Sequence, residues 1–186
     1  MIKDWSNITR TIQIKEEILL IHGATPAKDL ARLNFDFQLN TFRPAIKQKE
    51  ALIEISKLDN GKVVTAQLKD NIVGYVTFHS PDKFERWSAG PSQVLELGAI
   101  EVSPLIRKSG VARNMLEVAF HDFIMENYIV LATEYYWHWD LEGSGMHVWE
   151  YRDMMRRLME HVGMVVTDTD EEDINSHPAN MLMVRY

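Results

Sequence analysis

The chain contains no cysteine, and this absence excludes three kinds of chemistry. It can form no disulfide bond and no thiolate metal site, and it can carry no acyl group on a cysteine nucleophile. If the protein transfers an acyl group, direct attack of the acceptor on a bound acyl donor is therefore the simplest route.

Long apolar runs and excess positive charge are also missing. No stretch approaches the roughly 18 apolar residues of a membrane span, and the first residues (MIKDW) form no apolar signal region, so we expect a cytoplasmic protein without a membrane partner. The formal net charge is −7, which argues against nucleic-acid binding because that requires a concentrated basic surface. An acidic protein is better matched to a partner that presents lysine or a basic loop.

Composition and patterning indicate one globular domain over residues 1–186, with a core of about residues 8–167. Periodicity predicts an α/β fold that mixes strands and helices. Strands are expected within 8–21, with a turn near 15–17, and at 63–68, 72–78, 95–102, 129–137, 164–167 and 181–184. The strands at 63–68 and 72–78 are expected to form a hairpin. Helices are expected from Thr25 as cap with Pro26 in the first turn, and at 44–58, from the loop at 107–112 to near 127, and at 148–162.

Residues 95–127 are the most informative segment, because they read as a strand, a glycine-containing loop and a helix. The loop Arg107-Lys108-Ser109-Gly110-Val111-Ala112 fits the pattern R/Q-x-x-G-x-G/A. The helix after it has apolar residues at Leu116, Ala119, Phe120 and Phe123. Unpaired N–H groups and the macrodipole at a helix start bind anions, and small residues let a pyrophosphate approach the backbone. The chain has neither G-x-G-x-x-G nor G-K-[ST], so coenzyme A fits better than a dinucleotide or a P-loop nucleotide.

In this arrangement the segment resembles the acyl-CoA pyrophosphate loop of the GNAT acetyltransferase superfamily, and the order of expected elements is similar too. The resemblance implies a central mixed sheet with splayed parallel strands flanked by helices, and acetyl-CoA as cosubstrate with no metal. It also implies that the backbone at Ala99, Ile100, Glu101 and Val102 binds the pantetheine arm like an added strand. Gly98 would then permit a close approach or a bulge.

Several longer segments resemble one family of protein acetyltransferases, the acetoin utilisation family AcuA. They include TFRP (41–44), IVGYVT (72–77), MENYIV (125–130), TEYYWHWDL (133–141), VWEYR (148–152) and SHPAN (176–180). This resemblance implies acetylation, and so inactivation, of the active-site lysine of AMP-forming acetyl-CoA synthetase. Transfer would be direct, within a ternary complex.

Transfer to lysine requires a base, because a lysine with a pKa near 10.4 is mostly charged at neutral pH. Glu96 is the first candidate; its place eleven residues before Arg107 resembles that of the catalytic glutamate of histone-acetylating GNATs. Glu101 is the second. A carboxylate on a central strand is costly to bury without a partner, so either one is equally explained by a structural ion pair.

The acid that protonates the departing thiolate is less clear from the sequence. Many GNATs have a tyrosine just before the Gly-aromatic that closes the second core helix, but here Met159 stands in that position, ahead of Gly163. Tyr151 is our candidate replacement, with Tyr135, Tyr136, His138 or water as alternatives.

Aromatic residues crowd into 135–151, and core packing explains about half of them. The alternative is a lysine tunnel or partner surface that includes Tyr135, Tyr136, His138 and Trp139. His138-x-Asp140 lacks a third ligand and predicts no metal site. The acidic run 168–173 is either a solvated loop or a region that steers a basic target loop.

Three alternative functions remain open at this point. They are a small-amine GNAT, a protein that inhibits its partner mainly by tight docking, and a catalytically inactive sensor of coenzyme A. No residue pattern specifies an oligomeric state.

Overall fold

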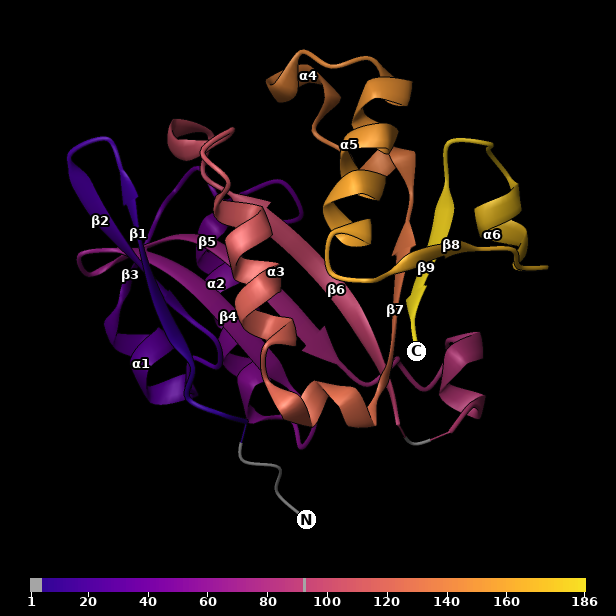
Figure 1. Ribbon diagram of the computed structural model, residues 1–186, viewed down its shortest axis with the longest axis horizontal. Helices are drawn as coiled ribbons and strands as arrows, with labels where there is room; N and C mark the ends of the chain where they lie inside the picture. The colour runs from indigo at the N-terminus through magenta and orange to yellow at the C-terminus, as the bar shows by residue number, and fades with distance from the viewer. Residues whose placement is uncertain (1–4, 92) are drawn as a thin grey trace.

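One mixed sheet organises the chain in the computed structural model, which describes residues 5–91 and 93–186. Within these residues the strands lie in the order β1-β2-β4-β5-β6-β7-β9-β8, and the short β3 pairs with β5 beside that path. Figure 1 shows β1 and β2 at one side of the molecule and β8 and β9 at the other. The strands are β1 (Thr9–Ile14), β2 (Glu17–His22), β3 (Asn34–Phe35), β4 (Lys62–Leu68), β5 (Asn71–His79), β6 (Val94–Val102), β7 (Ile129–Glu134), β8 (Val165–Thr167) and β9 (Met181–Arg185).

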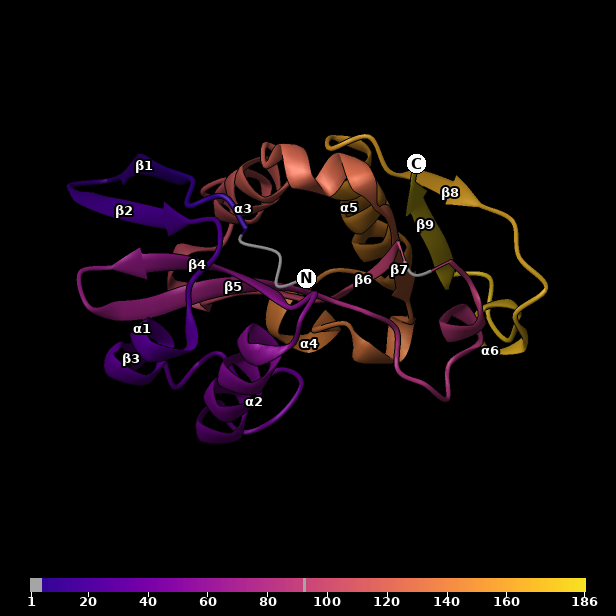
Figure 2. The same ribbon diagram turned by 90° about the horizontal axis from the view of Figure 1, so that it is seen from below.

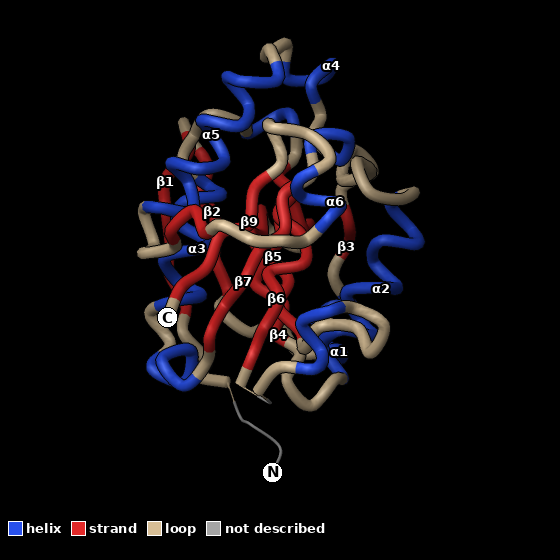
Figure 3. The backbone as a smooth tube through the Cα atoms, turned by 90° about the vertical axis from the view of Figure 1, so that its right-hand side faces the viewer, coloured by secondary structure: helices blue, strands red, loops and turns tan. Residues whose placement is uncertain are grey.

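Helices cover both faces of the sheet. Figures 2 and 3 show α3 and α5 on one face and α1 and α2 on the other. The helices are α1 (Ala27–Arg32), α2 (Ala45–Lys57), α3 (Val111–Phe120), α4 (Leu141–Ser144), α5 (Val148–Glu160) and α6 (Glu172–Asn175). Short 3₁₀ turns are η1 (Arg86–Ala89), η2 (Pro104–Ile106), η3 (Phe123–Asn127) and η4 (Tyr136–His138). No helix in the described part of the chain is long and apolar enough to cross a membrane.

The main core lies between the sheet and the helices α3 and α5. Apolar residues at helical spacing supply it, among them Met115 and Leu116 from α3 and Met155 and Met159 from α5. A capping box begins α5, because Glu150 accepts a hydrogen bond from the backbone N–H of the N-cap residue at 2.9 Å. This packing fixes both helices against the two strands that form the site described below.

The parallel strands β6 and β7 separate partway along their length. Their pairing is limited to the registers Val94–Ile129, Leu95–Val130 and Glu96–Leu131. Beyond Glu96, β6 continues to pair with β5, while β7 pairs with β9. Past this point no strand of the described chain pairs with one edge of β6, and the expected splayed parallel pair is confirmed.

Gly98 forms a bulge just past the point of separation. Thr77 of β5 pairs with Ala99 and Phe78 pairs with Leu97, so Gly98 is the extra residue. A Cβ at this position would lie 2.5 Å from Nε2 of His79, which explains why glycine stands there. The bulge expected at Gly98 is confirmed.

Most of the expected elements are present. The hairpin of β4 and β5, the helix α2, the strand β6 and the turn between β1 and β2 lie where the sequence predicts them. The cap at Thr25 was wrong: Pro26 is the N-cap of α1, and the Thr25 hydroxyl bonds to that of Thr65 at 2.7 Å. The helix after the glycine loop is also shorter than expected, because α3 ends at Phe120 and Phe123 is exposed in a 3₁₀ turn.

The C-terminal strand belongs to the core. β9 lies between β7 and β8, and Met183 is fully buried in the main core. The core therefore extends past residue 167, the limit expected from the sequence. The strand expected at 129–137 ends earlier, at Glu134, where the chain turns into η4.

Candidate active site

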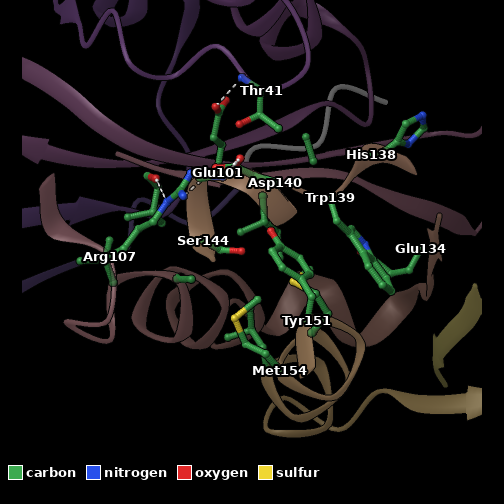
Figure 4. A pocket seen from close by; sticks show the side chains of 18 of the residues that line it. Thr41, Glu101, Arg107, Glu134, His138, Trp139, Asp140, Ser144, Tyr151 and Met154 are labelled. Carbon is green, nitrogen blue, oxygen red and sulfur yellow. Dashed lines mark hydrogen bonds and ion pairs between the residues drawn. The ribbon is translucent and has the colours of Figure 1, made fainter. Parts of the chain in front are cut away.

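The separation of β6 and β7 opens a cavity of about 800 Å³, which we call the slot. Its walls are the free part of β6 (Leu97–Val102) and the end of β7 (Thr133, Glu134). The loop after β6 and the start of α3 form one end, and α5 lies along it. Figure 4 shows labelled side chains around this space, among them Arg107 on one side and Glu134 and Tyr151 on the other.

The loop between β6 and α3 has the geometry of an anion site. Lys108 and Gly110 both have positive φ, 65° and 79°, and Gly110 is the N-cap of the ten-residue helix α3. The first N–H groups of α3 thus have no intrahelical acceptor. Of the six predicted loop residues, five line the slot: Arg107, Lys108, Gly110, Val111 and Ala112. Ser109 does not; its hydroxyl donates to the carbonyl of Ile106.

Arg107 connects the two walls at the mouth of the slot. Its Nη1 lies 2.7 Å from Oδ2 of Asp140, which follows η4 on the β7 side. Its Nε donates to the carbonyl of Val102 at 3.3 Å. Asp140 in turn caps α4 by accepting a hydrogen bond from the N–H of Gly143 at 2.9 Å. The same guanidinium that the sequence assigns to the pyrophosphate therefore also crosses the slot.

Glu101 anchors a loop. One of its carboxylate oxygens accepts a hydrogen bond from the hydroxyl of Tyr75 at 2.5 Å, and the other accepts one from the backbone N–H of Thr41 at 2.8 Å. The residue is buried, and Figure 4 shows its side chain directed at Thr41. Burial, followed by the negative charge of Glu101, raises the pKa of Tyr75. Glu101 thus ties the segment between α1 and α2 to β6.

Glu96 lies on the sheet face opposite to α3 and α5. Its neighbours Leu95 and Leu97 point into the main core, so Glu96 faces the other way, opposite His79 in the register of β5. Burial, followed by the adjacent carboxyl of Glu85, raises the pKa of Glu96 to about 8. A carboxyl with a pKa near neutrality is suited to proton transfer.

A second cavity of about 720 Å³ lies on that face. It is lined by the α1–α2 segment, by Thr77 and His79 of β5, and by η4 with the residues after it. It shares several residues with the slot, so the two cavities meet across β6. The shared residues are Thr41, Phe42, Gly98, Ala99, Pro104, Arg107, His138, Trp139 and Asp140.

Trp139, Tyr151 and Glu134 form a cluster inside the slot. The rings of Trp139 and Tyr151 stack with centroids 5.2 Å apart, and the indole N–H donates to Oε2 of Glu134 at 2.8 Å. Burial raises the pKa of Glu134 to about 7 and also raises that of Tyr151. Glu134 is not among the site residues predicted from the sequence. The signal that points to it is a charged residue at the end of an otherwise uncharged strand.

The other predicted contact residues divide between the slot and its outer edge. Tyr135 and His138 line the slot, and the ring of Tyr135 stacks on Trp137 at 4.8 Å. Tyr136 instead packs on His177, with centroids 4.1 Å apart, and lines neither cavity. Met159 of α5 is fully buried in the core, and its thioether side chain has no hydroxyl that could donate a proton. The described residues contain no group of three or more His, Asp or Glu side chains arranged to hold a metal.

Comparison with known proteins places this geometry in a family. The model of the acetyltransferase (GNAT) family matches residues 30–138. The acetoin utilization proteins AcuA of Bacillus licheniformis and Bacillus subtilis are 47% and 49% identical over 177 and 168 residues. These matches cover 95% and 90% of this chain and 84% and 80% of the relatives.

Solved structures agree. The crystal structure of an acetoin utilization protein from Exiguobacterium sibiricum has a TM-score of 0.96 and 43% identity, covering 100% of this chain and 88% of that one. The structure of yncA from Salmonella typhimurium with acetyl-CoA shares the fold alone, with a TM-score of 0.55 and 15% identity over 89% of this chain and 91% of its own. Together with the splayed strands and the glycine loop, these matches show that the chain belongs to the GNAT acetyltransferase family and is similar to its AcuA members.

Proposed function

We propose that the protein is an acetyl-CoA-dependent protein lysine N-acetyltransferase that acetylates and inactivates AMP-forming acetyl-CoA synthetase by direct transfer. One observation carries the proposal. A slot with an anion-binding loop at one end meets a second, open cavity at the bulge of β6, so a donor and an acceptor have separate entries to one point. Such an arrangement favours attack within a ternary complex.

The slot fits acetyl-CoA. Residues Ala99–Val102 have a strand on one side only, so the pantetheine amides find unpaired backbone groups there. The left-handed turn at Gly110 and the start of α3 suit the pyrophosphate, with Lys108 and Arg107 supplying positive charge. The amide next to the Gly98 bulge would polarise the thioester carbonyl.

The second cavity fits a protein rather than a small amine. Phe42 and Trp137 line it and are 40% and 50% exposed, so apolar side chains project from its rim on both the α2 side and the η4 side. Exposed aromatic residues around a groove are typical of protein interfaces.

Glu96 is our proposed base. Glu96 is not among the residues that line either cavity; it lies on the sheet face of the second cavity, two residues before Gly98 and opposite His79, which both line it. With a pKa of about 8, roughly one tenth of Glu96 is ionised at pH 7, and that fraction is a stronger base than an ordinary carboxylate. We assign Glu101 to anchoring, because both of its oxygens already accept hydrogen bonds.

The test is to mix the protein with an AMP-forming acetyl-CoA synthetase, with and without acetyl-CoA, and to map added acetyl mass by peptide mass spectrometry. We expect acetylation of one lysine of the synthetase, in step with loss of its activity. Inhibition without added mass would contradict catalysis and support docking. Acetylation of free polyamines or amino acids in preference to the synthetase would support a small-amine transferase.

Two variants complete this experiment. Glu96→Gln retains the shape of the side chain and removes the base, so we expect acetylation to fall by about 10²-fold. Glu17→Gln removes the same charge from an exposed position at the start of β2 and serves as the control. A docking inhibitor would keep its effect in both variants.

A further inference from the structure

Glu134 ends the wall of the slot that β7 provides. β6 and β7 last pair at Glu96 and Leu131, and three residues further along each strand lead to Ala99 and Glu134. Because Gly98 is an extra residue in β6, Glu134 lies at about the depth of Ala99 and Ile100 on the opposite wall. Val130 and Ala132 point into the main core, so alternation directs Glu134 to the same side, toward α5. The carboxyl accordingly faces the interior of the slot (Figure 4).

Among the described residues, Glu134 accepts one side-chain hydrogen bond and has no ion-pair partner. The indole N–H of Trp139 donates to Oε2, and the ring of Trp139 stacks on Tyr151. From β9, the residue opposite Glu134 is Met181, which is apolar. Apolar side chains from α5 line the slot nearby: Met154, Met155 and Leu158.

The other charged groups of the slot are paired or lie on the opposite wall, whereas two titratable side chains share the side of Glu134. Arg107 at the mouth is bound to Asp140. Tyr151 from α5 and His138 from η4 are the titratable side chains on the Glu134 side. On the β6 and α3 side are Glu101, Lys108 and Arg113. None of these cations forms an ion pair with Glu134 among the described contacts.

We propose that Glu134 is the general acid that protonates the sulfur of coenzyme A as it leaves. This inference rests on the proposed acetyl transfer. The lysine ammonium first releases one proton to solvent. The neutral nitrogen then forms a bond to the acetyl carbon and loses a second proton to Glu96. The bond between that carbon and sulfur breaks, its electron pair goes to sulfur, and Glu134 gives its proton to that sulfur. One proton is taken up by Glu96 and one released by Glu134, so exchange with solvent restores both carboxyls.

Two further observations support this role. The α5 position that carries a tyrosine in many GNATs is Met159, which is buried and has no proton to give. Burial also raises the pKa of Glu134 to about 7, so a large fraction of it is protonated at neutral pH. Tyr151, whose pKa is raised above the ordinary value, is a weaker acid than Glu134 in the same cavity.

The experiment measures single-turnover acetylation of the synthetase between pH 5.5 and 9.5 by wild type, Glu134→Gln and Trp139→Phe. Glutamine keeps an oxygen to accept the indole N–H, so the variant retains the geometry and loses only the acidic proton. We expect the rate of E134Q to fall about 10²-fold with little change in the KM for acetyl-CoA, and the decline of the rate at alkaline pH to disappear.

Trp139→Phe tests the role of Glu134 in a second way, by changing its pKa and leaving the carboxyl in place. It keeps an aromatic ring against Tyr151 and removes the hydrogen bond that stabilises the Glu134 carboxylate, so the pKa of Glu134 rises. We expect the alkaline decline to move to higher pH, an outcome that a purely structural hydrogen bond does not produce. The pH profile of the wild type alone does not show which residue causes each limb of the rate curve. The changes in the profiles of E134Q and W139F identify the residue behind the alkaline limb.

The outcomes separate this inference from the proposed function. A wild type that acetylates no lysine contradicts both. A wild type that acetylates the synthetase, with E134Q unchanged in rate and pH profile, contradicts the role of Glu134 alone. If E134Q is slow but keeps the alkaline decline, or if W139F leaves the decline in place, Glu134 is not the acid. Unfolding curves of each variant show whether a rate change comes from loss of fold.

Discussion

Glu96→Gln is expected to make the protein more stable at alkaline pH while it removes activity. The carboxyl of Glu96 is pushed from its ordinary pKa of 4.5 to about 8 because it is half-buried beside Glu85. The unfolded chain therefore ionises Glu96 at a lower pH than the folded chain does. Between these two values the folded state binds more protons, so its stability falls as pH rises. Below 4.5 both states hold the proton and the penalty is absent.

The size of the effect follows from the shift. Each tenfold change in an ionisation constant is worth roughly 1.4 kcal/mol, which gives an upper bound of about 5 kcal/mol for Glu96 above pH 8. Residual solvent access and proton sharing with Glu85 reduce this to about 2–3 kcal/mol. Glutamine does not ionise, so E96Q avoids the penalty. Active-site groups that oppose stability in this way are common.

The assay is urea unfolding of wild type and E96Q at pH 5 and pH 8.5. We expect the two proteins to be nearly equal in unfolding free energy at pH 5, and E96Q to be more stable by about 2–3 kcal/mol at pH 8.5. The exposed control E17Q is expected to show no such pH-dependent gain. An equal difference at both pH values, or a less stable E96Q at pH 8.5, would refute the reasoning.

Three further predictions concern the site and its support. Glu85→Gln removes the carboxyl that raises the pKa of Glu96, so the acidic limb of the rate profile should move to lower pH; a limb that stays in place contradicts the pairing. In Gly110→Ala the added Cβ has room, with only Asn114 at 3.7 Å, but alanine is strained at the φ of 79°. We expect a loss of about 1–2 kcal/mol in the free energy of unfolding and a higher KM for acetyl-CoA. Gly145→Ala, at φ 66° outside both cavities, should show the strain without the KM change. Lys62→Ala leaves Asp122 buried without its partner at 2.9 Å, and urea unfolding should show a loss of about 3–5 kcal/mol.

The strand, the glycine turn and the helix start on one side of the slot are well predicted from the sequence because they are local. The strand, the turn at Gly110 and the start of α3 lie within twenty-odd consecutive residues, and their periodicity and turn chemistry specify them without help from the rest of the fold. The bulge at Gly98 is also readable, since glycine inside a strand indicates close packing of another group.

The acceptor side is less readable because its contacts are distant in sequence. Glu101 meets Tyr75 and Thr41 from 26 and 60 residues away, and no pattern around Glu101 distinguishes an anchoring carboxylate from a base. Glu134 acquires its raised pKa from burial between β7 and α5, which depends on tertiary packing. Phe123 continues the helical spacing of the apolar residues of α3, but Asp122 ends that pattern by capping the 3₁₀ turn η3. Phe123 is the first residue of this turn, and its ring is exposed.

The position of β9 has a consequence for biosynthesis. β7, which carries one wall of the slot, is held on its outer side by β9, whose residues 181–185 are made about fifty residues after β7 itself. The donor loop and β6 leave the ribosome much earlier. A nascent chain thus has the residues of its anion-binding turn long before the opposing wall of the slot has the strand that supports it.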